Sequence, residues 1–471
     1  MELLTDRPGD EGLPGRERAA VMAALMTATV MVVFDGTVIN IALPKMADAL
    51  QVSPDVAIWF ANGYLLAVAM LLATFAALAS RIGFRPLFLS GLALFTLASA
   101  ACALAPDAHA LIALRVLQGA GGAAVVSIGP AILRFAFPSR LLGRILGLNA
   151  LLIAASTAIA PIVGGALLDA WGWQWLFALN VVPGAMALAI ALKAIPAGPA
   201  IVRKPFDIPG AVLSAVLVGA LIMAADRVMK PGDGWYALAA LLAGAGFVWR
   251  LRRAEQPLLP PAIFASPRFS FAALTSMAAF VGQSMTFVAL PFLFQNVYGY
   301  GASETALLLM PWPVGIVLIA PHAGRWADRM SPAMISTVGL SVLLAGQISL
   351  ACLPAQPQVW DIAARCLLCG IGFGCFQSPN NREMLSNVSR EHSGYASGVL
   401  AIMRTFGQCL GAALVGVLLA VHVQDAGQAI GRQAVQPGLW LAAVATALAI
   451  VLSLGRMRGT PRRLAPSGET V

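Results

Sequence analysis

Long apolar stretches separated by short polar segments dominate the chain. Fourteen such runs can be recognised, and most approach the roughly 20 residues that a helix needs to cross a bilayer. The shortest is the run at 235–250. Because the runs are continuously apolar and lack the alternation of barrel strands, we predict an all-α polytopic membrane protein with fourteen transmembrane helices. The runs cover residues 19–43, 56–79, 87–105, 110–133, 144–168, 174–195, 208–226, 235–250, 269–295, 304–321, 334–353, 359–380, 394–421 and 438–455.

Basic residues concentrate in alternate loops. If the N-terminus is cytoplasmic, the cytoplasmic segments hold about 23 Lys and Arg residues and the external loops about 4. This asymmetry is typical of the positive-inside rule. It predicts a multi-pass protein of the cell (inner or plasma) membrane, with cytoplasmic tails at 1–18 and 456–471 and no cleavable signal peptide.

Two Pro-rich loops, at 196–207 and 251–268, divide the chain. We therefore predict an N-terminal six-helix bundle over 19–195, two inserted transmembrane helices with flanking loops over 196–268, and a C-terminal six-helix bundle over 269–455. A degenerate repeat supports the division, because FAALASRIGFRP at 75–86 and AGRWADR at 323–329 each follow the second span of a half. Two six-helix halves are typical of secondary transporters.

Composition excludes several classes of protein. Hydrophobic residues make up 59% of the chain and charged residues 11%, whereas soluble proteins carry about 25% charged residues. The net charge of +9 is explained by the basic loops, so we expect no nucleic-acid partner. The sequence has no phosphate-binding GxxxxGK[ST] loop, so an ion gradient is the expected energy source. We expect no enzymatic activity, no cofactor and no bound metal, and the six cysteines are interpreted as helix-packing residues.

The first apolar run contains a carboxylate near its middle. Asp35 lies in FDGTVINIALP at 34–44. A charge at the centre of a membrane helix costs about 2.5–3.5 kcal/mol, an expense that packing does not explain. We predict that Asp35 faces a water-filled cavity and binds and releases a proton. The alternative is that Asp35 caps a kink near Gly36.

The fourth run carries a second charge within the membrane. Arg115 lies in LIALRVLQGAGGAA at 111–124, and Gln118 follows on the same helix face. Arginine is permanently charged, so Arg115 can influence a nearby carboxylate but cannot carry the proton itself. The alternative is an arginine satisfied by backbone carbonyl groups.

Three further polar or small-residue motifs lie inside apolar runs. APIVGG at 160–165 predicts a flexible, closely packed helix or a generic small-residue interface. In WGWQWLFALNVVPG at 171–184 the tryptophans suit an interfacial belt, whereas Asn180 is a polar residue within a span. Arg404, four residues before Gln408, is open to a structural or a gating role and could extend to the cytoplasmic interface.

In this order, the motifs resemble the major facilitator superfamily, and specifically its 14-spanner drug:proton antiporter family. FDGTVINIALP, RVLQGAGGAA, APIVGG and WGWQWLFALNVVPG are similar to that family's signatures, as are residues 290–313 and 378–411. The resemblance covers nearly the whole chain and implies the major facilitator fold. The loop after the second helix departs from the family pattern, because Ala76 and Ser80 stand where the family has Gly and Asp.

The sequence and the resemblance together predict three groups of functional residues. Asp35 and Arg115 are expected to couple transport to protons. Because polyspecific pockets are mostly apolar with a few polar groups, a substrate cavity is expected at Phe34, Asn40, Gln118, Gln283, Gln295, Asn296 and Asn381. The residues expected to serve gating and helix packing are Arg81, Gly83, Arg85, Pro161, Gly164, Gly165, Gly324, Asp328, Arg329 and Arg404.

The resulting functional hypothesis is a proton-coupled antiporter that exports drugs or other lipophilic small molecules by alternating access. The single deep carboxylate suits a monovalent cation or a neutral lipophile. The main alternative is a dedicated exporter of one endogenous metabolite, such as an antibiotic, an amino acid or a lipid. A membrane sensor or scaffold is a poorer fit, because it would not need charges within the membrane. Expected partners are the small-molecule substrate, protons and membrane lipids, and a monomer should suffice.

Overall fold

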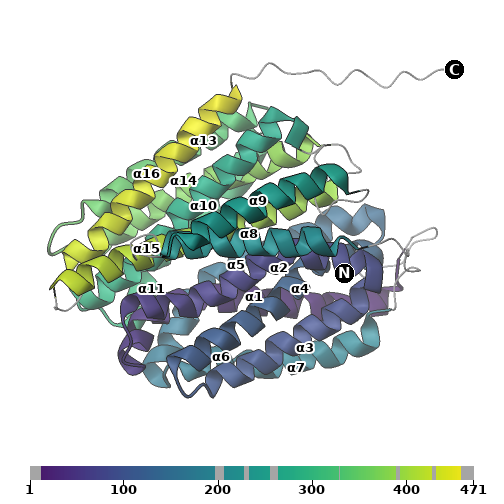
Figure 1. The fold of residues 1–471 in the computed structure, drawn as a ribbon, viewed down its shortest axis with the longest axis horizontal. Coiled ribbons are helices and arrows are strands. Elements are labelled where there is room, and N and C mark those ends of the chain that lie inside the picture. The colour runs from purple at the N-terminus through teal and green to yellow at the C-terminus, as the bar shows by residue number, and fades with distance from the viewer. Residues whose placement is uncertain are drawn as a thin grey trace.

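The computed structural model describes residues 12–196, 206–227, 233–254, 264–327, 329–388, 393–426 and 431–457, and Figure 1 shows their arrangement. These residues form helices joined by turns, and they include no β-strand. The N-terminal half consists of α1 (Gly15–Ala49), α2 (Pro54–Ile82), α3 (Phe84–Ala103), α4 (Ala108–Ala136), α5 (Ser139–Ala170), α6 (Gln174–Ala178) and α7 (Val181–Ala194).

The second half of the chain has a similar organisation. It follows an inserted helical hairpin, α8 (Ile208–Asp226) and α9 (Trp235–Arg253). The C-terminal half consists of α10 (Pro267–Phe292), the π-helical turn η3 (Leu293–Val297), α11 (Ala302–Leu309), α12 (Pro311–Trp326), α13 (Pro332–Ala351), α14 (Val359–Ser386), α15 (Ser393–Ala426) and α16 (Arg432–Met457). The all-helical prediction is confirmed.

Twelve helical segments of the described residues are long and apolar enough to cross a membrane. Two of the fourteen predicted spans are not among them, so the number fourteen is not confirmed. Of the 32 residues of α5, the apolar segment recognised among the described residues is Ala155–Ala170. The other is α9, whose last turn carries Arg250, Arg252 and Arg253.

The inserted hairpin lies across the junction of the two halves, as Figure 1 shows for α8 and α9. Helix α8 packs against both α2 and α15, whereas α9 packs mainly on α8. Ile222 of α8 is buried in a cluster with Cys409 and Ala413 of α15. One end of the hairpin is fixed by an ion pair of 2.7 Å between Arg250 and Asp207. The hairpin therefore contacts both halves mainly through α8.

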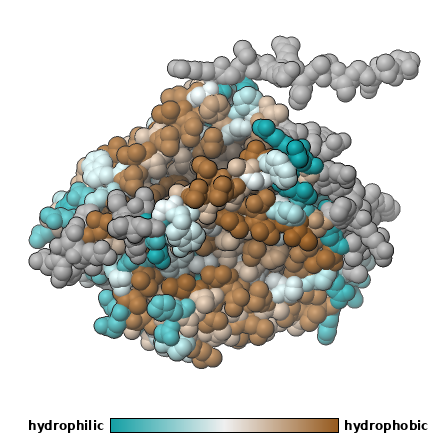
Figure 2. All heavy atoms as spheres, in the orientation of Figure 1, coloured by the Kyte–Doolittle hydropathy of each residue, from teal (hydrophilic) through white to brown (hydrophobic). Residues whose placement is uncertain are grey.

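Large apolar side chains cover the outside of the helices. Leu97, Val182 and Leu241 are each more than 65% exposed. Figure 2 shows hydrophobic residues spread over the face of the bundle, with hydrophilic residues gathered near its ends. A surface of this kind is stable against lipid hydrocarbon and unstable in water. The structure is therefore that of a multi-pass membrane protein.

Small residues bring α4 close to its two neighbours. A Cβ atom on Gly119 would lie 2.4 Å from the carbonyl oxygen of Tyr64 in α2, and one on Gly121 would lie 2.5 Å from the backbone nitrogen of Phe95 in α3. Backbone atoms cannot move away as a flexible side chain can, so both positions require glycine. This packing brings the first half of α4, which carries Arg115, against α2 and α3.

We predict that Gly121→Ala lowers the thermal unfolding temperature of the detergent-solubilised protein, because the added methyl group must separate α4 from α3. Overpacking typically costs about 1–3 kcal/mol. Gly129→Ala is the matched control on the same helix, since a Cβ atom there meets nothing within 4 Å. Equal unfolding temperatures for the two variants would contradict this account of the packing.

Candidate functional site: a buried ion pair between helices α1 and α4

Asp35 lies in the interior of α1, twenty residues after its first residue, which corresponds to about 30 Å along the helix axis. Its side chain is 1% exposed, and that of Arg115 in α4 is completely buried. The two side chains form an ion pair, with 2.5 Å between Arg115 Nη1 and Asp35 Oδ2. The two charges predicted within the membrane are thus direct partners.

Two amide side chains also donate hydrogen bonds to the same carboxylate. The Nε2 atom of Gln118 lies 2.9 Å from Asp35 Oδ1, and the Nδ2 atom of Asn180 lies 3.0 Å from it. Gln118 also accepts a hydrogen bond of 2.6 Å from Arg115 through Oε1 and donates one of 2.8 Å to Ser99. Three donors from two parts of the N-terminal half therefore converge on one carboxylate.

The rest of the Arg115 guanidinium group contacts backbone and aromatic groups. Its Nε atom donates a hydrogen bond of 2.7 Å to the carbonyl oxygen of Phe60. Its Nη2 atom is buried without a hydrogen-bond partner among the described residues. The guanidinium carbon lies 4.6 Å from the ring centroid of Tyr64 and 5.4 Å from that of Phe177. These ring faces offset part of the cost of burying the cation.

A helix break brings Asn180 to the site. The break between α6 and α7 falls at Leu179 and Asn180, three residues before Pro183. Proline has no backbone N–H and cannot donate to the residue four positions earlier, which is Leu179. The interruption leaves Asn180 at the start of α7, where its amide reaches α1. On the other side, Ser99 of α3 hydrogen-bonds the Phe95 carbonyl at 2.8 Å.

The surroundings of Asp35 differ from one sequence-based expectation. The carboxylate was expected to face a water-filled cavity, but it is almost completely buried in this conformation. The space around it is filled by Arg115, Gln118 and Asn180. Arg115 forms the ion pair with Asp35 and also donates a hydrogen bond to the Phe60 carbonyl. The expected charge partner and the alternative of a backbone carbonyl are therefore both present at this side chain.

The residues predicted to line a substrate cavity are distributed along the bundle. Gln118 belongs to the Asp35 site. Gln295, half-buried, and Asn296, exposed, lie in η3 at the end where α1 terminates, which we call the Ala49 end. There Gln295 donates a hydrogen bond of 2.9 Å to the Ile41 carbonyl of α1. Asn381 lies near the end of α14, at the opposite end of the bundle.

Phe34, Asn40 and Gln283 occupy positions between these two ends. Phe34 is buried beside Asp35 in the sequence, and Asn40 and Gln283 are half-buried in α1 and α10. The structure therefore does not gather the seven predicted cavity residues into one site.

The small residues predicted for helix packing in α5 lie where the two halves of the chain meet. A Cβ atom on Gly164 would lie 2.1 Å from Cγ2 of Val38 in α1, and one on Gly165 would lie 2.9 Å from Cα of Ser303 in α11. Pro161 is buried one turn earlier. The motif therefore brings α5 against both α1 and the C-terminal half.

The loop residues predicted for gating lie at the opposite end of the bundle. Arg81 is half-buried in the last turn of α2, and Gly83 ends that helix with a φ of +89°, a conformation that favours glycine. Arg85 donates a hydrogen bond of 2.8 Å to the Leu192 carbonyl. A Cβ atom on Gly324 would lie 3.2 Å from Ser378.

The remaining residues predicted for gating are in the C-terminal half. Arg329 is exposed, whereas Asp328 lies outside the described residues. Arg404 is half-buried within α15.

The two halves are also joined by polar contacts at the Ala49 end. Asp169, at the end of α5, forms an ion pair with Lys45 of α1. Its other carboxylate oxygen accepts hydrogen bonds from the backbone nitrogen of Ser303, at 3.0 Å, and from the Ser303 hydroxyl group. We call Lys45, Asp169 and Ser303 the Asp169 junction. No sequence motif predicts this junction, because its members are single polar residues at helix ends.

A second buried ion pair lies in the C-terminal half, far from the Ala49 end. Arg456 of α16 lies 3.2 Å from the Glu383 carboxylate of α14 and donates a hydrogen bond of 2.6 Å to Asn380. All three side chains are buried. The sequence does not single out this cluster, because both charges lie near helix ends, where charged residues are common.

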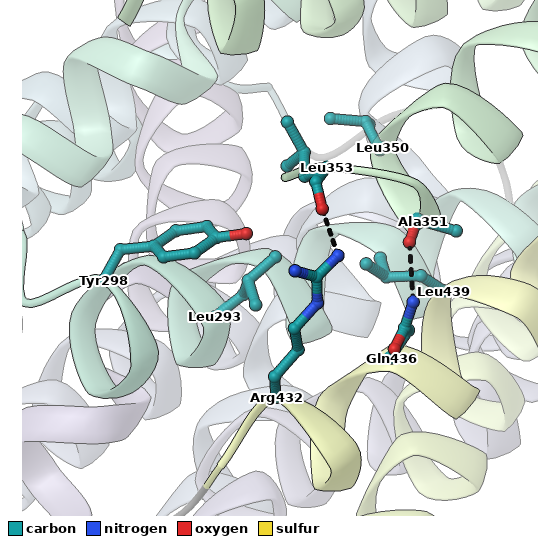
Figure 3. A pocket seen from close by; sticks show the side chains of 8 residues that line it. All are labelled: Leu293, Tyr298, Leu350, Ala351, Leu353, Arg432, Gln436 and Leu439. Carbon is teal, nitrogen blue, oxygen red and sulfur yellow. Dashed lines mark hydrogen bonds between the residues drawn. The ribbon is translucent and has the colours of Figure 1, made fainter. Parts of the chain in front are cut away.

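A small pocket within the C-terminal half lies at the Ala49 end. Figure 3 shows Arg432 and Gln436 of α16 donating hydrogen bonds to the carbonyl groups of Leu353 and Ala351 across it. Its volume of about 10 Å³ suits about one water molecule. The pocket is therefore too small to hold an organic compound.

Comparison with known proteins agrees with this architecture. The model of the Major Facilitator Superfamily matches residues 25–412, so the chain belongs to that superfamily. A solved structure titled as a bacterial homologue of the human lysosomal transporter Spinster, inward-facing and unoccupied, has a TM-score of 0.70 and 15% identity. That match covers 96% of this chain and 98% of the other chain.

Several relatives have names connected with drug resistance. The Multidrug resistance protein Stp of Mycobacterium tuberculosis (strain CDC 1551 / Oshkosh) is 30% identical over 83% of this chain and 74% of its own length. The Tetracenomycin C resistance and export protein of Streptomyces glaucescens is 33% identical over 88% and 78%. The Uncharacterized transporter YebQ of Escherichia coli (strain K12) is 38% identical over 87% and 91%. The names of the mycobacterial and Streptomyces relatives agree with the predicted relation to drug-efflux transporters of the superfamily.

We predict that Asp35→Asn and Arg115→Gln each lower the thermal stability of the detergent-solubilised protein, while the double variant loses less than the sum. Removing one partner of a buried ion pair costs about 3–5 kcal/mol, because the other charge stays buried and unpaired. The measurement is a double-mutant cycle of unfolding temperatures.

The partly exposed pair Asp361 and Arg365 of α14 is the control for this cycle, because such i,i+4 pairs contribute only about 0.3–0.5 kcal/mol. Strictly additive losses at Asp35 and Arg115 would contradict the coupling.

Proposed function

We propose that this chain is a proton-coupled antiporter that exports drugs or other lipophilic small molecules by alternating access. The observation that carries the proposal is the buried Asp35 carboxylate with its three converging donors. A carboxylate at this depth is costly, and in membrane proteins such groups mark ion and proton pathways. The membership of the superfamily and the relatives named for drug resistance support an export function.

The proton step follows from the hydrogen bonds of Asp35. Arg115, Gln118 and Asn180 all donate to its carboxylate oxygens, which is an arrangement for the ionised side chain. A protonated carboxyl group is neutral, and its O–H group is itself a donor that needs an acceptor, whereas all three of these partners offer it donors. Protonation therefore removes the charge that holds Arg115 and weakens the link between α1, α4 and α7.

Alternating access needs one side of the bundle to close while the other opens. In this conformation the halves are joined at the Ala49 end by the Asp169 junction and by the Gln295–Ile41 hydrogen bond. We assign the Ala49 end to the external side, because the positive-inside rule puts both termini in the cytoplasm. The proton then binds Asp35 from the outside, and its release to the cytoplasm restores the ion pair.

A proton gradient can supply the necessary energy. One charge moving through the membrane potential provides about 2.3 kcal/mol per 100 mV. The protein would work as a monomer in the inner or plasma membrane, surrounded by lipid, because each chain contains both halves of the pathway. The inserted hairpin contacts both halves through α8, and this placement suits lateral packing.

A dedicated exporter of one endogenous metabolite is the second candidate function. The relative named for tetracenomycin C favours it, since that name specifies a single compound, whereas the name of the mycobacterial relative specifies multidrug resistance. Both functions would use the same proton site. A panel of toxic compounds tested on expressing cells, with and without an uncoupler, separates them, because only the multidrug transporter protects against several unrelated compounds.

We predict that Asp35→Asn abolishes proton-driven export, because the amide cannot exchange a proton while its shape is nearly unchanged. Export is measured in inside-out vesicles as substrate uptake driven by an imposed pH gradient. Asp233→Asn, in the loop between α8 and α9, is the control and retains wild-type export. Full proton-driven export by Asp35→Asn would remove this residue from the mechanism.

We also predict that the Ala49 end is open for a larger fraction of the time in the Asp169→Ala variant than in wild type. The reporter is a Val38→Cys substitution in a chain that also carries Cys352→Ser, labelled from outside with a membrane-impermeant maleimide. Because Asp169 and Lys45 are 35% and 42% exposed, the lost contacts are weak, and labelling should rise by about twofold to fivefold. Asp361→Asn, whose partner Arg365 is on its own helix, is the control. Unchanged labelling in the Asp169→Ala chain would show that the junction does not hold this end closed.

A further inference from the structure

Arg404 is a membrane-embedded arginine that has no ion-pair partner among the described residues. It lies in α15, six residues after the start of the apolar segment Gly398–Val421, which corresponds to about 9 Å along the helix. Its side chain is half-buried, and among the described residues it makes no hydrogen bond and no ion pair. Arg115 and Arg456, by contrast, are each bound to a carboxylate.

The neighbours of Arg404 on α15 show which way its side chain is directed. Leu400 packs against a cluster of the C-terminal half that includes Phe269 and Met384. Ala401 packs against the core cluster of the N-terminal half. Arg404 follows these two residues by four and three positions, so it shares their face of the helix. Its side chain therefore emerges where the C-terminal half meets the N-terminal half.

The side of α15 that faces the inserted hairpin is a different one. Cys409 and Ala413 are buried against Ile222 of α8, and the Cys409 thiol contacts the Asn62 carbonyl of α2. Cys409 lies five positions after Arg404, a rotation of about 140° around the helix. The guanidinium group is therefore not directed toward α8 or the lipid beyond it.

Arg404 contributes a positive charge where the two halves of the chain meet. The Asp35 carboxylate is occupied by Arg115, Gln118 and Asn180, so it offers no free counter-ion to an organic cation in this conformation. One turn after Arg404, the half-buried Gln408 side chain also lacks a hydrogen-bond partner among the described residues. A guanidinium fork beside an amide is a set of donors that matches a carboxylate or another planar anion.

We propose that Arg404 binds the anionic group of the exported compound, and that the substrates are amphipathic organic anions such as aromatic carboxylates. This inference rests on the proposed export function. The sequence alone favours a monovalent cation or a neutral lipophile as the substrate, whereas this inference assigns the substrate a negative charge. An unpaired arginine in a partly dry environment is costly, and a bound anion offsets that cost.

The test compares two fluorescent probes with the same aromatic body, pyrenebutyrate and its neutral amide, pyrenebutanamide. Uptake into inside-out vesicles under a pH gradient is measured for wild type, Arg404→Gln and Arg404→Lys, with empty vesicles as background. Arg252→Gln, an exposed arginine of α9, is the matched control. Binding is measured separately, as the probe concentration that half-maximally raises the unfolding temperature of the purified protein.

The expected result is a loss that depends on the charge of the probe. Arg404→Gln weakens binding and uptake of pyrenebutyrate by about tenfold or more, because a charge-assisted hydrogen bond is lost, and changes the values for the amide by less than about twofold. Arg404→Lys retains part of the pyrenebutyrate activity, since it keeps the charge without the fork. Arg252→Gln matches wild type with both probes.

Three other results would overturn the inference. The first is an equal loss for both probes, which would indicate a structural or gating role for Arg404. The second is no loss for either probe, which would indicate an arginine that only extends to the interface. The third is that the wild-type protein binds the neutral amide but does not bind pyrenebutyrate. Failure of the proposed function is distinguishable, because wild-type protein would then bind pyrenebutyrate without any uptake driven by the pH gradient.

Discussion

The ion pair between Asp35 and Arg115 is the interaction on which the N-terminal half is organised. Two opposite charges lie in an apolar bundle with almost no exposure, and removing them from water costs several kcal/mol per ion. Their attraction offsets this cost only because Gln118, Asn180 and the Phe60 carbonyl use most of the remaining hydrogen-bonding positions. These partners come from α2, α4 and the start of α7, so the pair requires the helices to be packed in this way. The glycines of α4 allow this packing, because they let the helix that carries Arg115 lie close to α2 and α3.

The two halves of the chain use buried charge differently. In the N-terminal half the ion pair lies deep within α1 and α4. The buried pair of the C-terminal half, Glu383 with Arg456, lies near the end of the bundle opposite Ala49. Arg404, within the apolar segment Gly398–Val421 of the same half, has no ion-pair partner among the described residues. A duplicated architecture has therefore been divided, in the proposed mechanism, between one half that exchanges a proton and another that meets the substrate.

The sequence predicts the helices well, because long apolar runs in lipid must satisfy their backbone hydrogen bonds internally. It also predicts the two deep charges, because a charge in the membrane is costly and stands out in an apolar chain. It also marks Asn180 as unusual within a span. It does not predict that Asn180 reaches Asp35, since that contact depends on the helix break before Pro183 and on how α1 and α7 pack. For the same reason the predicted cavity residues do not gather in one place. Residue type and spacing give depth along a helix, but the direction of a side chain across the bundle depends on tertiary packing.

Helix α1 connects the proton site with the contact between the halves. Asp35 and Lys45 are ten residues apart on one helix, a separation of about 15 Å. Between them, Val38 contacts the position of Gly164, and the Ile41 carbonyl accepts the hydrogen bond of Gln295. The donors that hold Asp35 therefore also fix the rotation of the helix face that meets α5 and η3. A change in the charge of Asp35 that lets α1 rotate would misalign all of these contacts together. No separate signalling element is then needed, because one rigid helix carries both the group that titrates and the surface that closes.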